Sequence, residues 1–378
     1  MVCASVGRCA PVASQLELLN GAVLIALRAV ALASLLVLAA CTTAGRPATA
    51  GHPAVHPSAG HSGPPEQLTI AGARRAFAAF LPRFNGLPQG YSDAAARSVT
   101  TGAELQAQLF FKGASGSPIT KLTHVTFYVP RLAGWPRWFW VAGQQGGSRA
   151  AGHLFVMVQS ARSAPWKTAA ALYDLDSAAR MVHYLAEWVA RDSSGYATAV
   201  SPGELGLAVS PSAMPATYAS YLDQRAPRLV RRLFKPGPYT TDYIASNNKI
   251  ARGAGRYGWR DTDHQAPARL PVYGLWLNTG AAFVIFFTYD TASWVAKSSS
   301  AALPARPSGR EGTYVPPAFV IQGLGVSSVK AGTRLTATGV DRVLAFVQQR
   351  GTGPIYVMIN NGAVTGLRKS GPAVTPIA

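Results

Sequence analysis

A short acidic segment carries the residue types needed for proton transfer or cation binding. Asp261, Asp263 and His264 lie together in the run Arg260-Asp-Thr-Asp-His-Gln265. Carboxylates and an imidazole at this spacing can bind a divalent cation or share a proton. A glycine precedes the run and a proline follows it, which predicts a loop whose polar side chains bond their own backbone. A calcium loop needs further spaced oxygen ligands, so we expect the turn and no metal.

Nucleophilic catalysis has no convincing set of residues in this sequence. The Gly-x-Ser-x-Gly turn that presents a hydrolase serine does not occur. The run Ser327-Ser-Val-Lys330 has the Ser-x-x-Lys spacing of penicillin-recognising enzymes, but a Ser-x-Asn element at 246–248 precedes it instead of following it. So short a motif often arises by chance. We therefore predict no catalytic residue and no cofactor.

Two tryptophans are candidates for lining a ligand pocket. Trp138 and Trp140 alternate with Phe139 and Val141 in a run typical of a β-strand. Aromatic side chains line pockets for small ligands, and they also fill protein cores. Both alternatives stay open, and the period of two favours the core.

The segment 228–235 has the most regular pattern of cationic residues. Arg228, Arg231, Arg232 and Lys235 recur at the i, i+3, i+4 and i+7 positions of one helix face, and apolar residues take the other side. Such a helix would turn its basic face toward anionic lipid or an anionic envelope polymer. The alternative is a solvated face of a helix whose apolar side packs in the core.

One cysteine follows an apolar run near the start of the sequence. Residues 29–40 are uncharged and apolar, which suits the core of a signal peptide and is short for a membrane span. The letters Leu38-Ala39-Ala40-Cys41 resemble the lipobox of bacterial lipoproteins. The resemblance implies cleavage before Cys41, acylation of that residue with chains such as palmitate, and anchoring at the outer face of the cell membrane. The alternative is an ordinary signal peptide or an uncleaved anchor.

The charge balance indicates anionic partners. Lysine and arginine outnumber aspartate and glutamate by 35 to 16, a formal net charge of +19. An exported basic protein meets anionic lipids and envelope polymers, whereas no nucleic-acid-binding module accompanies the charge. The sequence names no protein partner. Because the only cysteines are Cys3, Cys9 and Cys41, a disulfide framework is excluded after residue 41.

The elements that must position these residues follow from the periodicity. Thr69 caps a helix that Pro82 ends, and shorter helices follow at 92–98 and 103–111. The period then changes to two, which predicts four antiparallel strands. This order repeats in the second half, with helices in 211–252, an irregular connection at 291–332, and strands at 272–278, 282–289, 334–348 and 355–361.

The sequence therefore divides into segments with different composition. The predicted segments are a signal peptide at 1–40, a disordered tether at 41–66, a first α+β unit at 67–176, a connector at 177–208, a second α+β unit at 209–370 and a disordered tail at 371–378.

Several short motifs resemble a domain of unknown function in secreted actinobacterial lipoproteins. They are Phe127-Tyr-Val-Pro130, Pro136-Arg-Trp-Phe-Trp140, Leu154–Val158, Ala164-Pro-Trp-Lys167 and the closing hairpin at 344–361. The resemblance covers most of residues 67–370. It implies two similar units, each with helices packed on a curved antiparallel four-strand sheet, similar to a cystatin or nuclear-transport-factor cone. It implies no activity.

These observations lead to one expected function and one alternative. We expect a membrane-tethered, non-enzymatic lipoprotein that presents a binding domain to an envelope partner, a ligand or an anionic polymer. The alternative is an extracytoplasmic hydrolase or small-ligand enzyme with its site inside one cone. That alternative requires Asp261, Asp263 and His264 to share a concave site with a further acid.

Overall fold

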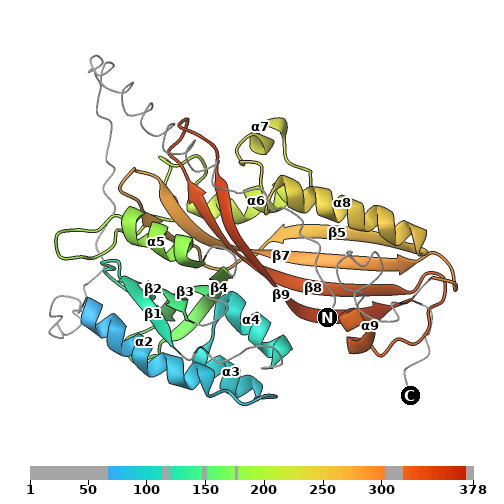
Figure 1. Ribbon diagram of the computed structural model, residues 1–378, viewed down its shortest axis with the longest axis horizontal. Coiled ribbons are helices and arrows are strands. Elements are labelled where there is room, and N and C mark those ends of the chain that lie inside the picture. Colours follow the sequence, from blue (N-terminus) through green and yellow to red (C-terminus); the bar gives the residue numbers. More distant parts are fainter. Residues whose placement is uncertain are drawn as a thin grey trace, which may run out of the picture. The chain divides into compact units, whose positions relative to one another are not determined.

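The structure is a computed structural model that describes residues 67–112, 119, 121–146, 151–174, 178–301, 303 and 318–371. The predicted signal peptide, Cys41, the tether and residues 372–378 lie outside the described residues. The described part is an α+β fold with two antiparallel sheets, of four and five strands, packed with helices (Figure 1). The predicted α+β class is thus confirmed.

Three helices open the described part, as predicted. They are α2 (Ile70–Asn85), α3 (Asp93–Val99) and α4 (Gly102–Phe111). The hydroxyl of Thr69 caps α2 by accepting a hydrogen bond from the amide of Gly72 at 2.9 Å. The prediction that Pro82 ends this helix is wrong, because α2 continues for three more residues and the amide of Gly86 bonds the carbonyl of Pro82 at 2.8 Å. A proline late in a helix removes one amide donor, and the neighbouring turns hold the rest.

The first sheet is a meander with the predicted strands. In order it contains β1 (Leu122–Tyr128), β2 (Arg137–Gln145), β3 (Ala151–Gln159) and β4 (Lys167–Asp174). Both faces of the sheet are buried. Phe139 and Phe155 pack against Phe77 and Phe80 of α2 on one face, while Trp140 belongs to the core on the other. Alternation along the strands therefore separates two cores instead of separating core from solvent.

Between the two sheets the chain forms four α-helices, of which α8 is the longest, and one 3₁₀ turn in the described residues. They are α5 (Ala178–Trp188), a 3₁₀ turn η1 (Pro211–Ala213), α6 (Met214–Leu222), α7 (Arg228–Arg231) and α8 (Thr241–Arg256). The expected basic helix over 228–235 is wrong, since α7 has only four residues. The chain leaves the helix because Phe234 is buried and bridges Ile355 in a strand-like pairing. None of the described helices combines the length and apolarity needed to cross a bilayer.

The second sheet has one strand more than predicted. Its elements are β5 (Trp259–Pro267), β6 (Tyr273–Trp276), β7 (Ala282–Ala296), β8 (Arg334–Val347) and β9 (Tyr356–Ser370), with α9 (Ala318–Gly323) before β8. The strand order is β5-β7-β8-β9, and β6 also pairs with β7. The predicted loop at 260–265 is wrong, because these residues lie in β5 and pair with β7. Both β7 and β9 extend well beyond the predicted strands.

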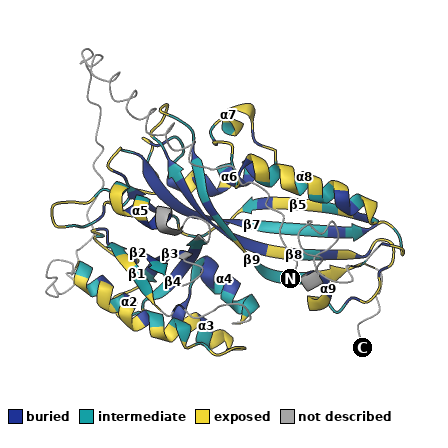
Figure 2. Ribbon diagram, viewed as in Figure 1, coloured by how far each residue is buried: buried dark blue, intermediate teal, exposed yellow. Residues whose placement is uncertain are grey.

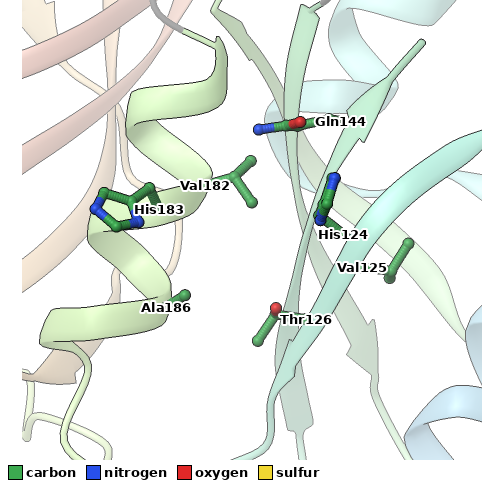
Figure 3. A pocket seen from close by; sticks show the side chains of 7 residues that line it. All are labelled: His124, Val125, Thr126, Gln144, Val182, His183 and Ala186. Atoms are coloured by element: carbon green, nitrogen blue, oxygen red, sulfur yellow. The ribbon is translucent and has the colours of Figure 1, made fainter.

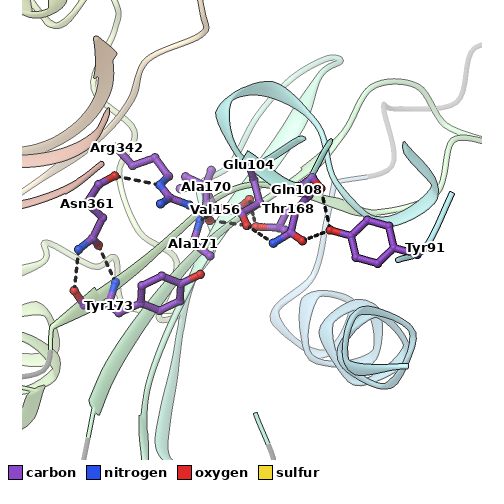
Figure 4. A network of polar contacts seen from close by, with 10 residues as sticks. All are labelled: Tyr91, Glu104, Gln108, Val156, Thr168, Ala170, Ala171, Tyr173, Arg342 and Asn361. Atoms are coloured by element: carbon purple, nitrogen blue, oxygen red, sulfur yellow. Dashed lines mark hydrogen bonds and ion pairs between the residues drawn. The ribbon is translucent and has the colours of Figure 1, made fainter. Parts of the chain in front are cut away.

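The two sheets share a core and a buried ion pair. Trp140 and Leu154 of the first sheet lie in one apolar cluster with Phe283 and Leu344 of the second. Beside it, Arg342 of β8 donates a hydrogen bond to Glu104 of α4 at 2.7 Å, and both side chains are almost completely buried (Figure 4). This pair joins the helices of the first sheet to the strands of the second.

Candidate functional site

One face of the second sheet is apolar at both ends and acidic in the middle. Residues two apart in a strand share a face, and on this face β7 and β8 pack against α6 at one end through Val284, Phe286 and Val343. At the other end Trp259, Trp294 and Leu335 form a separate core. Between these cores the same face carries four carboxyl side chains, those of Asp261, Asp263, Asp290 and Asp341.

A groove of about 340 Å³ opens over this acidic band, between α8 and strands β5 and β7. Four aspartates line it, and none of the lining residues that the structure describes is a lysine or an arginine. Apolar and amide side chains complete the wall. We call this site the acidic groove; its lining is Leu222, Asp223, Gln224, Tyr243, Ile244, Asn247, Asn248, Ile250, Ala251, Asp261, Thr262, Asp263, Asp290, Ala292 and Trp294. A volume of this size suits a small molecule.

Hydrogen bonds from α8 fix the position of Asp263. The hydroxyl of Tyr243 donates to its carboxylate at 3.2 Å, and the side-chain amide of Asn247 donates to the same oxygen. Tyr243 and Asn247 are four residues apart, so both lie on the helix face that covers the sheet. Gln265 supports the arrangement by donating to the hydroxyl of Tyr243 at 3.1 Å.

Two oxygens beside this network are buried without a hydrogen-bond partner. They are one carboxyl oxygen of Asp290 and the amide oxygen of Gln265. A buried polar atom left unpaired costs free energy, and most such atoms in folded proteins are satisfied. Of these two residues, only Asp290 lines the acidic groove.

The carboxyl groups of the groove differ in protonation. Burial raises the pKa of Asp290 far above its usual range, and its hydrogen bond with Asp263 and the charge of that residue raise it further. Burial, and to a smaller degree Asp263, raises the pKa of Asp261 to about 6. Burial also raises the pKa of Asp341 to about 6. Three carboxyl groups with raised pKa values therefore lie on this face of the sheet, and two of them, Asp261 and Asp290, line the groove.

Asp223 contributes to the groove in a different way. It closes the end of α6, and His264 lies 2.6 Å from it while Arg225 lies 3.4 Å away. These two partners neutralise Asp223. Among the described residues, no ion pair joins Asp261, Asp263 or Asp290 to a basic side chain. The negative charge of the groove is therefore available to a ligand.

A second, larger hollow of about 650 Å³ lies between β1, β2 and α5 (Figure 3). His124, Thr126 and Gln144 face it from the strands, and Val182 and His183 face it from the helix. A β-bulge between Thr123 and Thr126 interrupts the pairing there. None of the described residues that line this hollow carries a carboxyl group, so they offer less acid–base chemistry than those of the acidic groove.

The residues predicted from the sequence reach different parts of the structure. Trp140 is fully buried, and Trp138 packs edge-on against Tyr273 at 5.5 Å, so both lie in the core shared by the two sheets. Their role as ligand-binding residues stays a prediction. Arg228, Arg231, Arg232 and Lys235 lie in α7 and the segment after it, and all four are exposed.

Sequence reasoning identified two of the four aspartates that line the acidic groove. Asp261 and Asp263 were candidates, and His264 contacts the groove through Asp223. Asp223, Asp290, Tyr243 and Asn247 were missed. The spacing of Tyr243 and Asn247 in a helical stretch was a usable signal, whereas nothing in the sequence links Asp290 to a strand thirty residues earlier. Within the described ranges, no three histidine, cysteine, aspartate or glutamate side chains gather as ligands for a metal ion.

Two curated proteins are similar to part of this chain. An uncharacterized lipoprotein of Streptomyces avermitilis is 28% identical over 232 residues, which cover 57% of this chain and 64% of that protein. An uncharacterized lipoprotein of Streptomyces coelicolor is 26% identical over 196 residues, which cover 50% of this chain and 56% of that protein. The matched part thus spans less than two thirds of either relative, and no solved structure matches the chain.

The family comparison includes the acidic groove. The matching family model covers residues 68–315, a range that contains all four aspartates that line the groove, and it ends before β8. The predicted likeness to a domain of unknown function and to lipoproteins is supported at this level. Since the match covers more than half of the sequence, the chain belongs to the family described as Domain of unknown function (DUF8094).

Proposed function

We propose that this protein is a lipoprotein held at the outer face of the cell membrane by acyl chains on Cys41, and that it binds a small organic cation in the acidic groove. Its lipoprotein relatives and the Leu38–Cys41 sequence support the anchor. The anchored part acts by binding and not by catalysis. Each half of the domain is a cone of the cystatin or nuclear-transport-factor type, and the two helix-covered sheets support that likeness.

The observation that carries this function is the unneutralised acid on an otherwise apolar sheet face. The whole protein has a net charge of +19, yet none of the described residues that line the groove is a lysine or an arginine. Gathered carboxylates repel one another and lose hydration, so the fold gains nothing from them alone. A bound cation removes both penalties.

The wall of the groove points to an organic cation. Ile244, Ile250 and Trp294 offer apolar and aromatic surface beside the carboxylates. An alkyl or aryl amine matches both parts, because its ammonium group donates to carboxylates while its body contacts the apolar wall. Asp263 is the residue that would receive the ammonium group, since Tyr243 and Asn247 already hold it in place.

Calorimetry with phenethylamine tests this function. We expect heat of binding with phenethylamine and none with phenylethanol, which has the same body without the charge. Asp263→Asn weakens phenethylamine binding about ten-fold or more, because a charged hydrogen bond is lost. The matched control is Asp93→Asn, whose exposed carboxylate pairs with Lys112 at 3.2 Å outside the groove. Equal binding of the neutral analogue, or stronger stabilisation by calcium than by amines, would refute the proposal.

A hydrolase is the second candidate, and one observation favours it. Burial and Asp263 raise the pKa of Asp290 far above its usual range, and its hydrogen-bonded neighbour Asp263 faces the same groove. Carboxyl groups with separated protonation states are the usual form of a general acid and base. We expect no turnover of nitrophenyl esters or glycosides above that of the Asp290→Asn variant. A rate at least about ten-fold higher in the wild type would assign enzymatic function to the groove.

The anchor has its own test. Mass spectrometry of the purified membrane fraction should show an N-terminal acylated Cys41, and a Cys41→Ser variant should leave the membrane fraction. A variant that is processed and sediments with membranes like the parent would disprove the anchor, while the cation-binding result would stand unaffected.

A further inference from the structure

The α7 tip is the most exposed apolar point among the large hydrophobic residues that the structure describes. We define the tip as Arg228, Leu229, Arg232 and Lys235. Leu229 is 78% exposed. Figure 2 colours most of α7 as exposed, and Figure 1 shows it on an outer loop beyond α6. A single exposed leucine is common on protein surfaces, so its surroundings must decide its role.

The charged residues near Leu229 in the sequence are all basic. Between Asp223 and Asp242 the sequence has five basic residues and no acidic one, Arg225, Arg228, Arg231, Arg232 and Lys235. Arg225 forms an ion pair with Asp223 at 3.4 Å. No ion pair joins the three basic residues of the α7 tip to a carboxylate in the described part of the chain. Arg228 and Arg232, on either side of Leu229 in the sequence, thus form no ion pair in the described part of the chain, while the ammonium group of Lys235 lies 5.8 Å from the centre of the Tyr356 ring.

The fold holds this leucine outward. Arg231 ties the base of the tip by donating to the carbonyl oxygens of Ala226 at 3.0 Å and Gln224 at 2.6 Å. On the inner side, Phe234 is buried and packs against Tyr218 at 5.7 Å. The amide of Lys235 bonds the carbonyl of Ile355 at 2.8 Å. Because both ends of the tip are fastened, the exposure of Leu229 is a fixed feature of the surface.

We propose that the α7 tip docks on the anionic phospholipid surface of the membrane and orients the anchored domain there. Cations around an exposed leucine match a surface that has negative headgroups above an apolar layer. A soluble polyanion satisfies the arginines but gives the leucine no apolar phase. The inference rests on the proposed function for its location, because the anchor on Cys41 brings the domain close to lipid.

A fluorescent label on the tip tests this docking. The purified anchored protein carrying Leu229→Cys, labelled with the environment-sensitive dye NBD, is reconstituted into phosphatidylglycerol-containing vesicles and into phosphatidylcholine vesicles. The described part of the chain has no cysteine of its own to compete for the dye. We expect a blue-shifted NBD emission only with phosphatidylglycerol. In about 1 M salt the shift is lost, because the screening length falls to about 3 Å.

Two sets of variants identify the residues responsible. Arg228→Gln or Arg232→Gln in the labelled protein lowers the ratio of docked to undocked tips about five-fold each. The matched control label is at Leu205→Cys, since Leu205 is 72% exposed and follows Glu204 instead of an arginine. An equal shift at Leu205, an equal shift in phosphatidylcholine, or an equal shift with soluble dextran sulfate in place of vesicles would overturn the proposal.

Failure of the anchor is distinguishable from failure of the tip. If the protein does not float with vesicles, the anchor on Cys41 is wrong. The labelled chain is then mixed with excess phosphatidylglycerol vesicles, and its emission still decides whether the tip docks. Flotation without an emission shift overturns the tip and leaves the anchor standing.

Discussion

Strand β8 carries two neighbouring charged residues, Asp341 and Arg342, whose side chains leave the sheet through opposite faces. On the Arg342 face the guanidinium bonds Glu104 at 2.7 Å and the carbonyl of Asn361 at 3.1 Å. Glu104 in turn accepts from Gln108 at 2.9 Å and from the amide of Ala171 at 3.2 Å. Figure 4 shows Arg342 between Asn361 and Glu104, with Gln108 beside Glu104, and the guanidinium pairs with the carboxylate of Glu104.

On the Asp341 face the charges are of one sign. Thr288 donates to Asp341 at 3.3 Å, and Asp290 and Asp263 follow within the same acidic band. Burial raises the pKa of Asp341 and of Asp290, which means that the folded state resists ionising them. Two charged regions thus lie on opposite faces of one sheet. The one around Arg342 is buried with its charges paired, whereas the acidic one is partly exposed and its carboxyl groups have no paired cation among the described residues. A buried polar network in which every charge and hydrogen-bonding group is paired stabilises a fold, whereas a cluster of charges of one sign indicates a functional site.

The largest effect should come from breaking the complete network. Arg342→Met leaves Glu104 buried without a cation, and we expect a loss of about 3–5 kcal/mol in the free energy of unfolding. Adding Glu104→Leu should restore much of that loss, because an apolar pair of similar size needs no partner. Urea unfolding followed by tryptophan fluorescence measures both.

An exposed ion pair provides the control for this prediction. Lys112 and Asp93 are 3.2 Å apart, and their side chains are 48% and 59% exposed. Lys112→Gln should therefore cost less than about 1 kcal/mol. If Arg342→Met cost no more than Lys112→Gln, the view of the buried pair as a structural connection between the sheets would be wrong.

The sequence predicted the apolar parts of the fold better than its acidic part. Strands β2 and β3 show a clear period of two, because apolar residues occupy both faces and turns bound each run. In β5 the inward residues are Asp261, Asp263 and Gln265, and only Trp259 resembles a core residue. Because polar residues occupy these inward positions, the sequence lacks the apolar alternation of a strand. For that reason 260–265 was predicted as a loop. A functional site is where local patterns are expected to mislead.

The basic segment was misread for a different reason. Its spacing fits a helix, but Pro227 and Pro236 bound it and Phe234 finds a buried place beside Tyr218. Tertiary packing of one aromatic side chain outweighs the helix propensity of four or five residues, which is small per residue. Sequence alone cannot weigh a contact with Ile355, more than a hundred residues away.

Replacing Asp290 with a residue that does not ionise should raise the free energy of unfolding at high pH. The pKa of Asp290 is raised in the folded state by burial and by Asp263, so the folded protein keeps a proton that the unfolded chain releases above about pH 4. The stability from that proton is lost as the pH rises. Asparagine does not ionise, so Asp290→Asn should be more stable than the wild type by on the order of 1–2 kcal/mol near pH 8 and equal to it near pH 3.

Unfolding curves across this pH range, with Asp93→Asn as the control, measure the difference. The control should follow the wild-type pH dependence, since its carboxylate is exposed. Curves for Asp290→Asn that run parallel to the wild type at every pH would show that Asp290 ionises normally, and the contrast between the two faces of β8 would lose its basis.

The smallest effect should come from Asp261, at the open edge of the groove. Burial and Asp263 raise its pKa to about 6, so its contribution to stability is complete below about pH 4 and is lost as the pH rises to about 6. Water reaches part of this side chain and screens it, so Asp261→Asn should gain less than about 1 kcal/mol.

The pH separates the two acids in the same titration. The advantage of Asp261→Asn should level off near pH 7, while that of Asp290→Asn continues to grow above it, because deeper burial holds the second proton more tightly. If both variants levelled off at the same pH, the two carboxyls would titrate as one group, and the groove would hold a single shared proton instead of an acid beside a base.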